Sequence, residues 1–170
     1  MKKAIMISIQ PQYVEKILNG EKTIEIRKTM PKCELPCKVY IYCTMSNKQE
    51  NRKPHSWEVV WLKRVVAEFT LNKVDTLERD LNDWLPKNRY DVSNELLKDI
   101  NSNQNELWNY GQGKTLYAWH INDLKIYDKP KELSDFTRII DNSSGFWHYC
   151  HREKVTRPPQ SWMFVDNLEE

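Results

Sequence analysis

The order of strand-like and helix-like segments is the feature that most constrains the fold of this chain. Short runs rich in β-branched and aromatic residues lie before and after a stretch in which leucines recur at helical spacing. The strand-like runs fall at 4–9, 22–28, 38–44, 57–74, 115–121, 124–128 and 161–165, and the helical stretch spans 76–110. Strands on both sides of a helical insertion predict an α+β domain with a mixed barrel.

A short helix is expected directly after the first strand. Pro11 suits the first turn of a helix, where its missing N–H would be unpaired in any case. Val14 and Ile17 fall on one face, and Gly20 follows where a left-handed C-terminal cap is expected. This pattern predicts a helix at 11–19.

Two later segments also give specific expectations. Leu77, Leu81 and Leu85 repeat every four residues, and Ser93 begins a second helical run. Residues 46–57 are polar and predict a loop. Residues 141–152 are aromatic without a clear period, and we expect them to be irregular.

Length and charge limit the classes of protein to which the chain can belong. A chain of 170 residues predicts a single domain over 1–170. The net charge of +2 excludes a protein that coats nucleic acid by charge alone, so a nucleic-acid site would have to be local. No apolar run approaches the ~20 residues of a membrane span, and the N-terminal run is too short for a signal peptide. These features predict a cytoplasmic protein.

The sharpest motif is G-x-K-x-x-E-x-R at 20–27, with Lys22, Glu25 and Arg27 at its charged positions. In a strand, Ile24 and Ile26 would point to one side, and Thr23, Glu25 and Arg27 to the other. The motif therefore predicts a half-buried strand with a polar outer face. Arg offers a planar fork of donors for phosphate or a base edge, Lys a mobile charge, and a carboxylate between them can orient both. The alternative is a solvated face with a weak surface ion pair.

The motif resembles the signature of the ASCH domain family. The segments GKTLYAWHINDLKIYDKPKELSDF and TRPPQSWMFV are similar to long bacterial and phage-associated members, so the resemblance covers most of the chain. It implies a PUA-like mixed β-barrel, with an N-terminal helix before the motif strand and a helical insertion. It also implies a charged cleft that binds RNA or a nucleotide-like ligand.

Aromatic residues on a late strand are candidates for the wall of such a cleft. Tyr117 and Trp119 are two residues apart and would therefore share one face of the strand. RNA-binding proteins commonly stack bases on rings of this kind. The alternative is that these rings form the core. Both interpretations stay open on the sequence alone.

The segment TRPPQSW adds Arg157, Gln160 and Ser161 near a turn that two prolines stiffen. The resemblance implies that this segment lies close to the motif strand, which makes Arg157 and Ser161 candidate ligand contacts. The alternative is a loop that closes the barrel, with Trp162 in the core.

A zinc site is the main metal alternative. Cys33 and Cys37 lie near the motif, and His148, Cys150 and His151 cluster later in the chain. Zinc sites usually take closely spaced pairs of such ligands, but the first two cysteines lack C-x-x-C spacing. We therefore expect thiols, no metal site and no cofactor. Walker and Rossmann glycine patterns are also absent from the sequence, which disfavours nucleoside-triphosphate and dinucleotide chemistry.

The leading functional hypothesis is an RNA- or nucleotide-binding module built on Lys22, Glu25 and Arg27. The alternative is an amidohydrolase that acts on a modified nucleoside such as acetylated cytidine, because some small ASCH relatives resemble such enzymes. Those relatives use a Lys and a Thr three residues later, where this chain has Glu25. Thr23 lies only one residue after Lys22, so an enzyme would have to use Lys22, Thr23 and Glu25. A third hypothesis is a regulatory partner protein without a small ligand.

Overall fold

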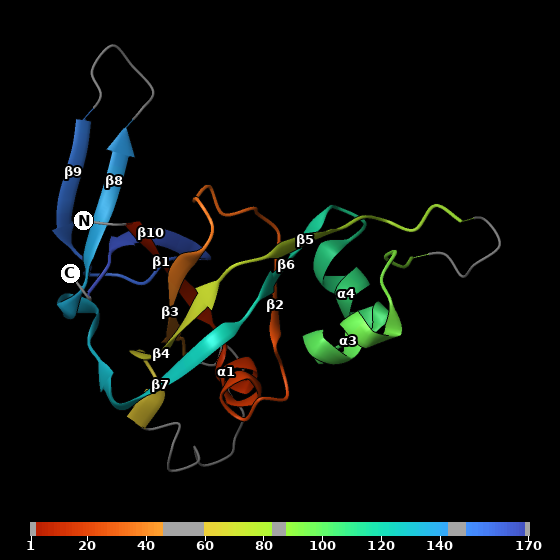
Figure 1. Cartoon of the computed structure of the whole chain (residues 1–170), viewed down its shortest axis with the longest axis horizontal. Helices are drawn as coiled ribbons and strands as arrows, with labels where there is room; N and C mark the ends of the chain where they lie inside the picture. The colour runs from red at the N-terminus through yellow and green to blue at the C-terminus, as the bar shows by residue number, and fades with distance from the viewer. Residues whose placement is uncertain (1–2, 46–59, 83–87, 143–148, 169–170) are drawn as a thin grey trace. The chain divides into compact units, whose positions relative to one another are not determined.

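The computed structural model describes residues 3–45, 60–82, 88–142 and 149–168 (Figure 1). The chain divides into two compact units. One, here called the large-sheet unit, comprises Met1–Glu15, Cys37–Thr70 and Asp123–Glu170. The other, here called the motif unit, comprises Lys16–Pro36 and Leu71–Asn122 and contains the charged motif.

Within the described residues, the large-sheet unit contains seven strands in the spatial order β7-β4-β3-β1-β10-β8-β9. The strands are β1 (Lys3–Ile9), β3 (Cys37–Cys43), β4 (Arg64–Leu71), β7 (Asn122–Lys131), β8 (Thr137–Asn142), β9 (Tyr149–Lys154) and β10 (Trp162–Asp166). Strand β1 pairs in parallel with β3 and antiparallel with β10. Its continuous apolar run explains this inner position, since a strand buried on both faces has no polar side to present.

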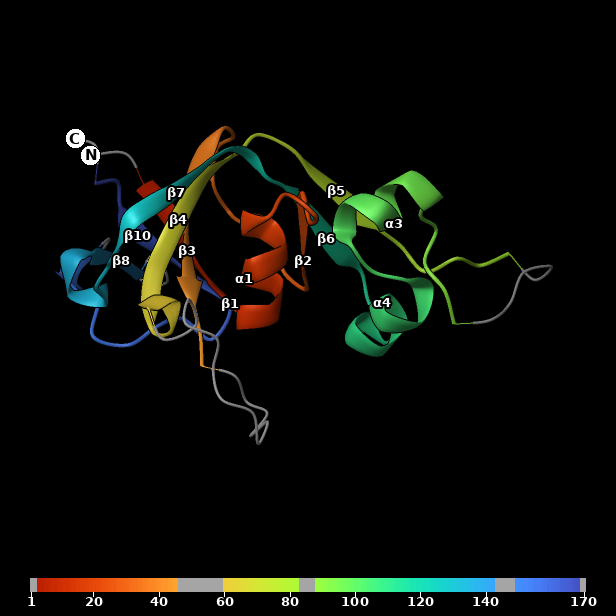
Figure 2. The same ribbon diagram turned by 90° about the horizontal axis from the view of Figure 1, so that it is seen from below.

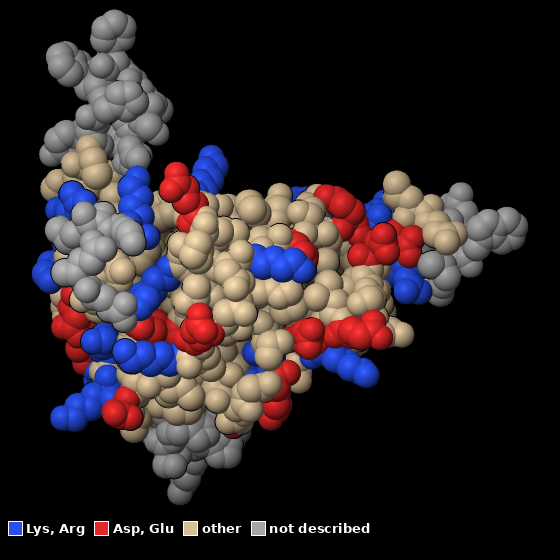
Figure 3. All heavy atoms as spheres, in the orientation of Figure 1, with Lys and Arg blue, Asp and Glu red and all other residues tan. Residues whose placement is uncertain are grey.

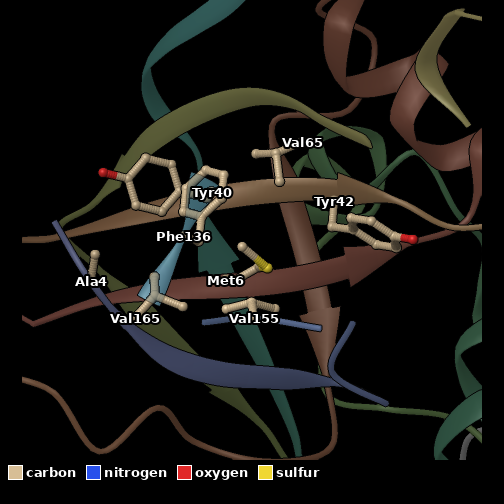
Figure 4. Close-up of a cluster of buried hydrophobic side chains, with 8 residues drawn as sticks. All are labelled: Ala4, Met6, Tyr40, Tyr42, Val65, Phe136, Val155 and Val165. Carbon is tan, nitrogen blue, oxygen red and sulfur yellow. The ribbon is translucent and has the colours of Figure 1, made fainter. Parts of the chain in front are cut away.

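The core of this unit gathers side chains from several strands (Figure 4). Successive side chains of a strand point to opposite faces, so Ala4 and Met6 lie on one face of β1. Tyr40 and Tyr42 share a face of β3 in the same way and belong to the same cluster. Phe136 packs edge-on against Tyr40, with ring centroids 5.0 Å apart. The remaining members of the cluster are Val65, Val155 and Val165.

The motif unit has a three-stranded antiparallel sheet in the order β2-β6-β5. It consists of β2 (Ile24–Arg27), β5 (Val74–Leu77) and β6 (Leu116–His120), together with the helices α3 (Asn94–Ile100) and α4 (Gln104–Gly111). Figure 2 shows both helices beside β5 and β6. One sheet face, the two helices and the segment before α3 form a second core from Ile24, Ile26, Leu77, Tyr90, Ile100, Leu107, Leu116 and Ala118.

The expected first helix is confirmed as α1 (Pro11–Leu18), which begins at the proline. The later helices begin at polar caps. The Ser93 side chain accepts a hydrogen bond from the Leu96 N–H, which confirms the second helical run. Asn103 and Glu106 form a reciprocal capping box at the start of α4.

Several sequence expectations were wrong in detail. Leu77 ends a strand instead of starting a helix, and Leu81 is 79% exposed and lies outside any helix. Leu85 and residues 46–57 lie outside the described residues. The stretch 141–152, expected to be irregular, contains the end of β8 and most of β9, which pair antiparallel. The short strand expected at 124–128 is the longer β7, and η1 (Leu133–Asp135), a 3-10 helix, follows it.

The α+β class is confirmed, with α1 before the motif strand and with α3 and α4 inserted between β5 and β6. Among the described strands the large sheet has two ends, at β7 and β9, so a closed barrel is not formed there. Within the same residues, no helix is long and apolar enough to cross a membrane.

Candidate functional site

A tight turn leads from α1 into the motif. Gly20 adopts φ +76°, a left-handed conformation that glycine reaches without a Cβ penalty. The N–H of Gly20 donates to the Ile17 carbonyl, and the N–H groups of Glu21 and Lys22 both donate to the Lys16 carbonyl. The turn satisfies the last carbonyls of α1 and fixes the position at which Lys22 leaves the helix.

The end of α3 holds the beginning of the motif strand. Lys22 Nζ donates to the Ile100 carbonyl at 2.8 Å, and the Thr23 N–H donates to the Asp99 carbonyl at 2.9 Å. A cation at the carbonyl end of a helix also interacts favourably with the helix dipole. Lys22 therefore has a structural contact in addition to any contact with a ligand.

Glu25 lies between two cations. One carboxylate oxygen is 3.6 Å from Lys22 Nζ, and the other is 3.1 Å from Arg27 Nη2. The side chains of Lys22, Glu25 and Arg27 are only 6%, 10% and 9% exposed. The expectation of a half-buried strand with a polar outer face was thus wrong, because all four residues of β2 are buried. We call Lys22, Glu25 and Arg27 the charged triad.

Burial changes the titration of the lysine. Desolvation lowers the pKa of the Lys22 amine below its ordinary value, while the nearby negative charge of Glu25 opposes this shift. Arg27 and Lys16 lower the pKa further by repulsion between like charges. The amine is consequently easier to deprotonate than an exposed lysine.

Strand pairing places the two candidate aromatic residues beside the triad. Trp119 lies directly opposite Glu25, and Tyr117 directly opposite Arg27, in the antiparallel pair of β2 and β6. Residues opposite each other in this way share one face of the sheet. Trp119 is fully buried, so it packs as a core residue here, whereas Tyr117 is partly exposed.

One aromatic residue near the strand, Tyr110, precedes the late strand in the sequence and was not selected there as a site residue. The amine of Lys28, the residue directly after β2, lies over the Tyr110 ring at 4.7 Å from its centroid, and Tyr110 as a residue is 40% exposed. The two residues are far apart in sequence, so no local spacing could reveal the contact. Adjacency to the motif was the only signal for Lys28.

The remaining candidates are placed less directly. Arg157 is exposed and Ser161 partly buried, and both belong to the large-sheet unit. Their segment is attached to Ser8, whose hydroxyl donates to the Pro159 carbonyl at 2.7 Å and whose N–H donates to the Ser161 carbonyl. Their contact with a ligand stays a prediction. Thr23 has an exposed side chain, whereas its proposed catalytic partner Glu25 is engaged by the two cations.

The cysteines are distributed between the two units. Cys33 lies in the motif unit, while Cys37 and Cys150 lie in the large-sheet unit, and all are thiols. Cys37 is buried and Cys150 is exposed. His148 lies outside the described residues, so the expectation of no structural zinc stays a prediction.

Comparison with known proteins gives one consistent result. No protein-family model matches the sequence, and no curated protein matches it either. Among solved structures, ASCH from Zymomonas mobilis is similar over 96% of this chain and 87% of that one, with a TM-score of 0.57 and 17% identity. A Tyr-to-Phe mutant of that protein (TM-score 0.55, 17% identity) covers 97% of this chain and 91% of its own. A Ser-to-Ala mutant of the same protein has a TM-score of 0.55 and 18% identity, and the similarity covers 96% of this chain and 88% of the mutant chain.

Proposed function

We propose that this chain, which has the fold of an ASCH domain, binds RNA or a nucleotide-like ligand through the motif unit. The PUA-like form of the fold, with which the ASCH structures agree, supports this assignment. The observation that carries the proposal is the charged triad, in which a buried carboxylate lies between two buried cations. Burying three charges removes them from water, which makes the protein less stable than it would be with apolar residues at the same positions. Function is a sufficient reason for a chain to retain them.

Each member of the triad has a separate role in this proposal. Arg27 supplies the fork of donors for a phosphate or a base edge. Glu25 orients Arg27 and can accept a hydrogen bond from the amino group of a base. Lys22 adds charge and, through the Ile100 carbonyl, keeps the strand attached to α3.

Burial also indicates how a ligand reaches the triad. A guanidinium side chain that is 9% exposed leaves only a small part of its surface open to a ligand. This geometry favours a planar group, such as a base, over a wide stretch of phosphate backbone. Lys28 and the exposed ring of Tyr110 lie beyond the strand end, where a neighbouring base could stack.

The charges on the rest of the molecule support a local site. Basic and acidic side chains are intermingled on the face drawn in Figure 3. The net charge of +2 is also too small to attract nucleic acid over a distance. Affinity must therefore come from specific contacts.

The test is a titration of short single-stranded RNAs and free nucleotides at two salt concentrations. Binding should weaken as salt rises, because cations released from phosphate drive part of the affinity. Arg27→Ala should weaken binding by about 1–3 kcal/mol, the value of a bidentate contact. The matched control is Lys129→Ala, which removes an exposed cation of β7. Far-UV circular dichroism verifies that each variant is folded. Absence of binding, or equal affinity in Arg27→Ala, contradicts the proposal.

The amidohydrolase alternative has one favourable observation, the lowered pKa of Lys22, since an amine of lowered pKa gives up its proton more readily. The exposed Thr23 and the ion-paired Glu25 make a poor nucleophile and base. We expect no efficient hydrolysis of acetylcytidine. Turnover that both Thr23→Ala and Lys22→Ala abolish would establish the enzyme instead.

A further inference from the structure

The motif unit contains a pocket of about 530 Å³ at the junction of α3 and α4. Its volume is within the range of small-molecule sites. The lining includes Lys16, Leu97, Lys98, Asn101, Ser102 and Glu106. None of these residues was a candidate on the sequence, because α1 and the helical insertion contribute to the pocket from distant parts of the chain.

The acidic residue of the pocket is already engaged. The Glu106 carboxylate accepts hydrogen bonds from the Ser102 hydroxyl at 2.8 Å and from the Asn103 N–H at 3.3 Å. The contact with Asn103 belongs to the capping box of α4, in which the Asn103 side chain also accepts from the Glu106 N–H. The start of α4 is therefore capped from within the chain.

Two lysines supply the remaining charge. Lys16 Nζ donates to Asn101 Oδ1 at 2.6 Å, which fixes the amine at the pocket and uses one of its three donors. Lys98 is exposed and lies on the same wall. Two cations against one engaged carboxylate leave a net positive pocket with hydrogen-bond donors, which suits an anion.

The pocket is also connected to the charged triad through one short segment. Asn101, which holds Lys16, directly follows Ile100, whose carbonyl accepts from Lys22 Nζ. The Asn101 amide also donates to the Glu21 carbonyl at 3.4 Å. The end of α3 therefore contacts both the pocket lysine and the first residue of the triad.

We propose that this pocket binds the phosphate group of a nucleotide, with Lys16 and Lys98 as its two cations. The identity of the ligand as a nucleotide rests on the proposed function, whereas the preference for phosphate rests on the pocket alone. A free phosphate ion would occupy only a small part of 530 Å³, so the attached nucleoside fills the remainder against Leu97.

Calorimetric titration with cytidine monophosphate, cytidine and inorganic phosphate tests this assignment. The monophosphate should bind more tightly than either of the other two. Lys16→Gln and Lys98→Gln should each weaken its binding about tenfold, the effect of losing one charge-assisted hydrogen bond. Lys114→Gln, an exposed lysine of the same unit outside the pocket, should leave it unchanged. Lys98 is exposed, so its variant remains folded even if loss of the Lys16–Asn101 hydrogen bond disturbs α3.

The two proposals fail in different ways. If Arg27→Ala loses RNA binding while both pocket variants bind the monophosphate like wild type, the pocket assignment is wrong and the proposed function stands. If RNA does not bind but the binding of the monophosphate still depends on Lys16 and Lys98, the pocket assignment holds and the proposed RNA binding is wrong. Equal affinity for cytidine and its monophosphate, or for phosphate and the monophosphate, overturns the pocket assignment.

Discussion

Three charged residues at and just before one short strand are nearly removed from solvent, since Lys22, Glu25 and Arg27 are 5%, 7% and 7% exposed. A buried charge is tolerated when a partner and hydrogen bonds replace the lost water. Glu25 provides the partner for both cations, and the Ile100 carbonyl accepts from Lys22. Removal of Glu25 alone would leave two like charges together, so the three residues act as one unit.

The titration of Lys22 should be visible in the stability of the protein. Because burial lowers the pKa of Lys22 below 10.5, the unfolded chain binds more protons than the folded chain between the lowered value and 10.5. Stability due to Lys22 therefore rises with pH across this window. In Lys22→Arg the side chain stays charged, so the unfolding free energy of wild type minus that of the variant should increase with pH. Urea unfolding of both proteins at several pH values below 10.5 measures this difference in unfolding free energy. A constant difference would show that the pKa of Lys22 is not lowered.

The sequence predicted part of this arrangement. Spacing along a strand correctly placed Glu25 and Arg27 on one face, where they form an ion pair. It could not predict the contact of Lys22 with Ile100, which lies 78 positions away. Nor could it predict burial, because alternation of polar and apolar residues suggests an exposed side. The hydrogen bonds that compensate the buried charges come from another element.

At the scale of elements, the period of the leucines was misleading. Leu77 and Leu81 are four residues apart, and this spacing is equally compatible with a strand that ends at Leu77 and a loop that contains Leu81. Pairing with β6 decided the outcome, since Val74–Leu77 lies opposite Leu116–Trp119 in register. Ser93, by contrast, was a reliable signal, because a side-chain cap acts within a few residues of its own position.

The contact between α4 and the segment before α3 depends on one glycine. A Cβ at Gly111 would overlap the Tyr90 hydroxyl and lie 2.9 Å from Leu116 Cδ1. Gly111→Ala should therefore destabilise the protein by about 1–3 kcal/mol. Tyr90→Phe also loses the hydrogen bond to the Lys114 carbonyl, but the double variant should cost less than the sum, since the residues are in contact. Urea unfolding of the four proteins measures the coupling. Asn109→Ala, exposed on the same helix, is the control, and strict additivity would contradict the argument.

At the scale of the whole molecule, neither unit is a continuous piece of chain. The chain passes from one unit to the other after Glu15, Pro36, Thr70 and Asn122. Unfolding of one unit would leave the segments of the other joined by long flexible loops, whose closure costs entropy. We therefore keep the prediction of a single cooperative domain.

Hydrogen exchange followed by mass spectrometry in increasing urea tests cooperativity. Amides of β3 in the large-sheet unit and β6 in the motif unit should become exposed at the same urea concentration. Gly111→Ala, although it lies in the motif unit, should shift both transitions equally. Exposure of β6 before β3 would show two independently unfolding domains.

The class of the fold was predictable, whereas its sheets were not. Runs of β-branched residues and capped helices are local signals, and they gave the α+β class, α1 and the helical insertion. Strand order depends on pairings between distant segments, such as β1 with β10, for which a single sequence contains no local signal. The open order of the large sheet was missed for this reason.

The pairing of β1 with β10 has a consequence for the protein as it is made on the ribosome. Lys3–Ile7 cannot complete its pairing until Trp162–Asp166, the last of the described strands, has been translated. At about 5–20 residues per second, the interval after β3 is complete lasts on the order of ten seconds. Throughout this time one side of an isoleucine-rich strand offers unpaired backbone groups to other nascent chains. The newly made polypeptide is therefore most in need of a chaperone in the interval before its final strand emerges.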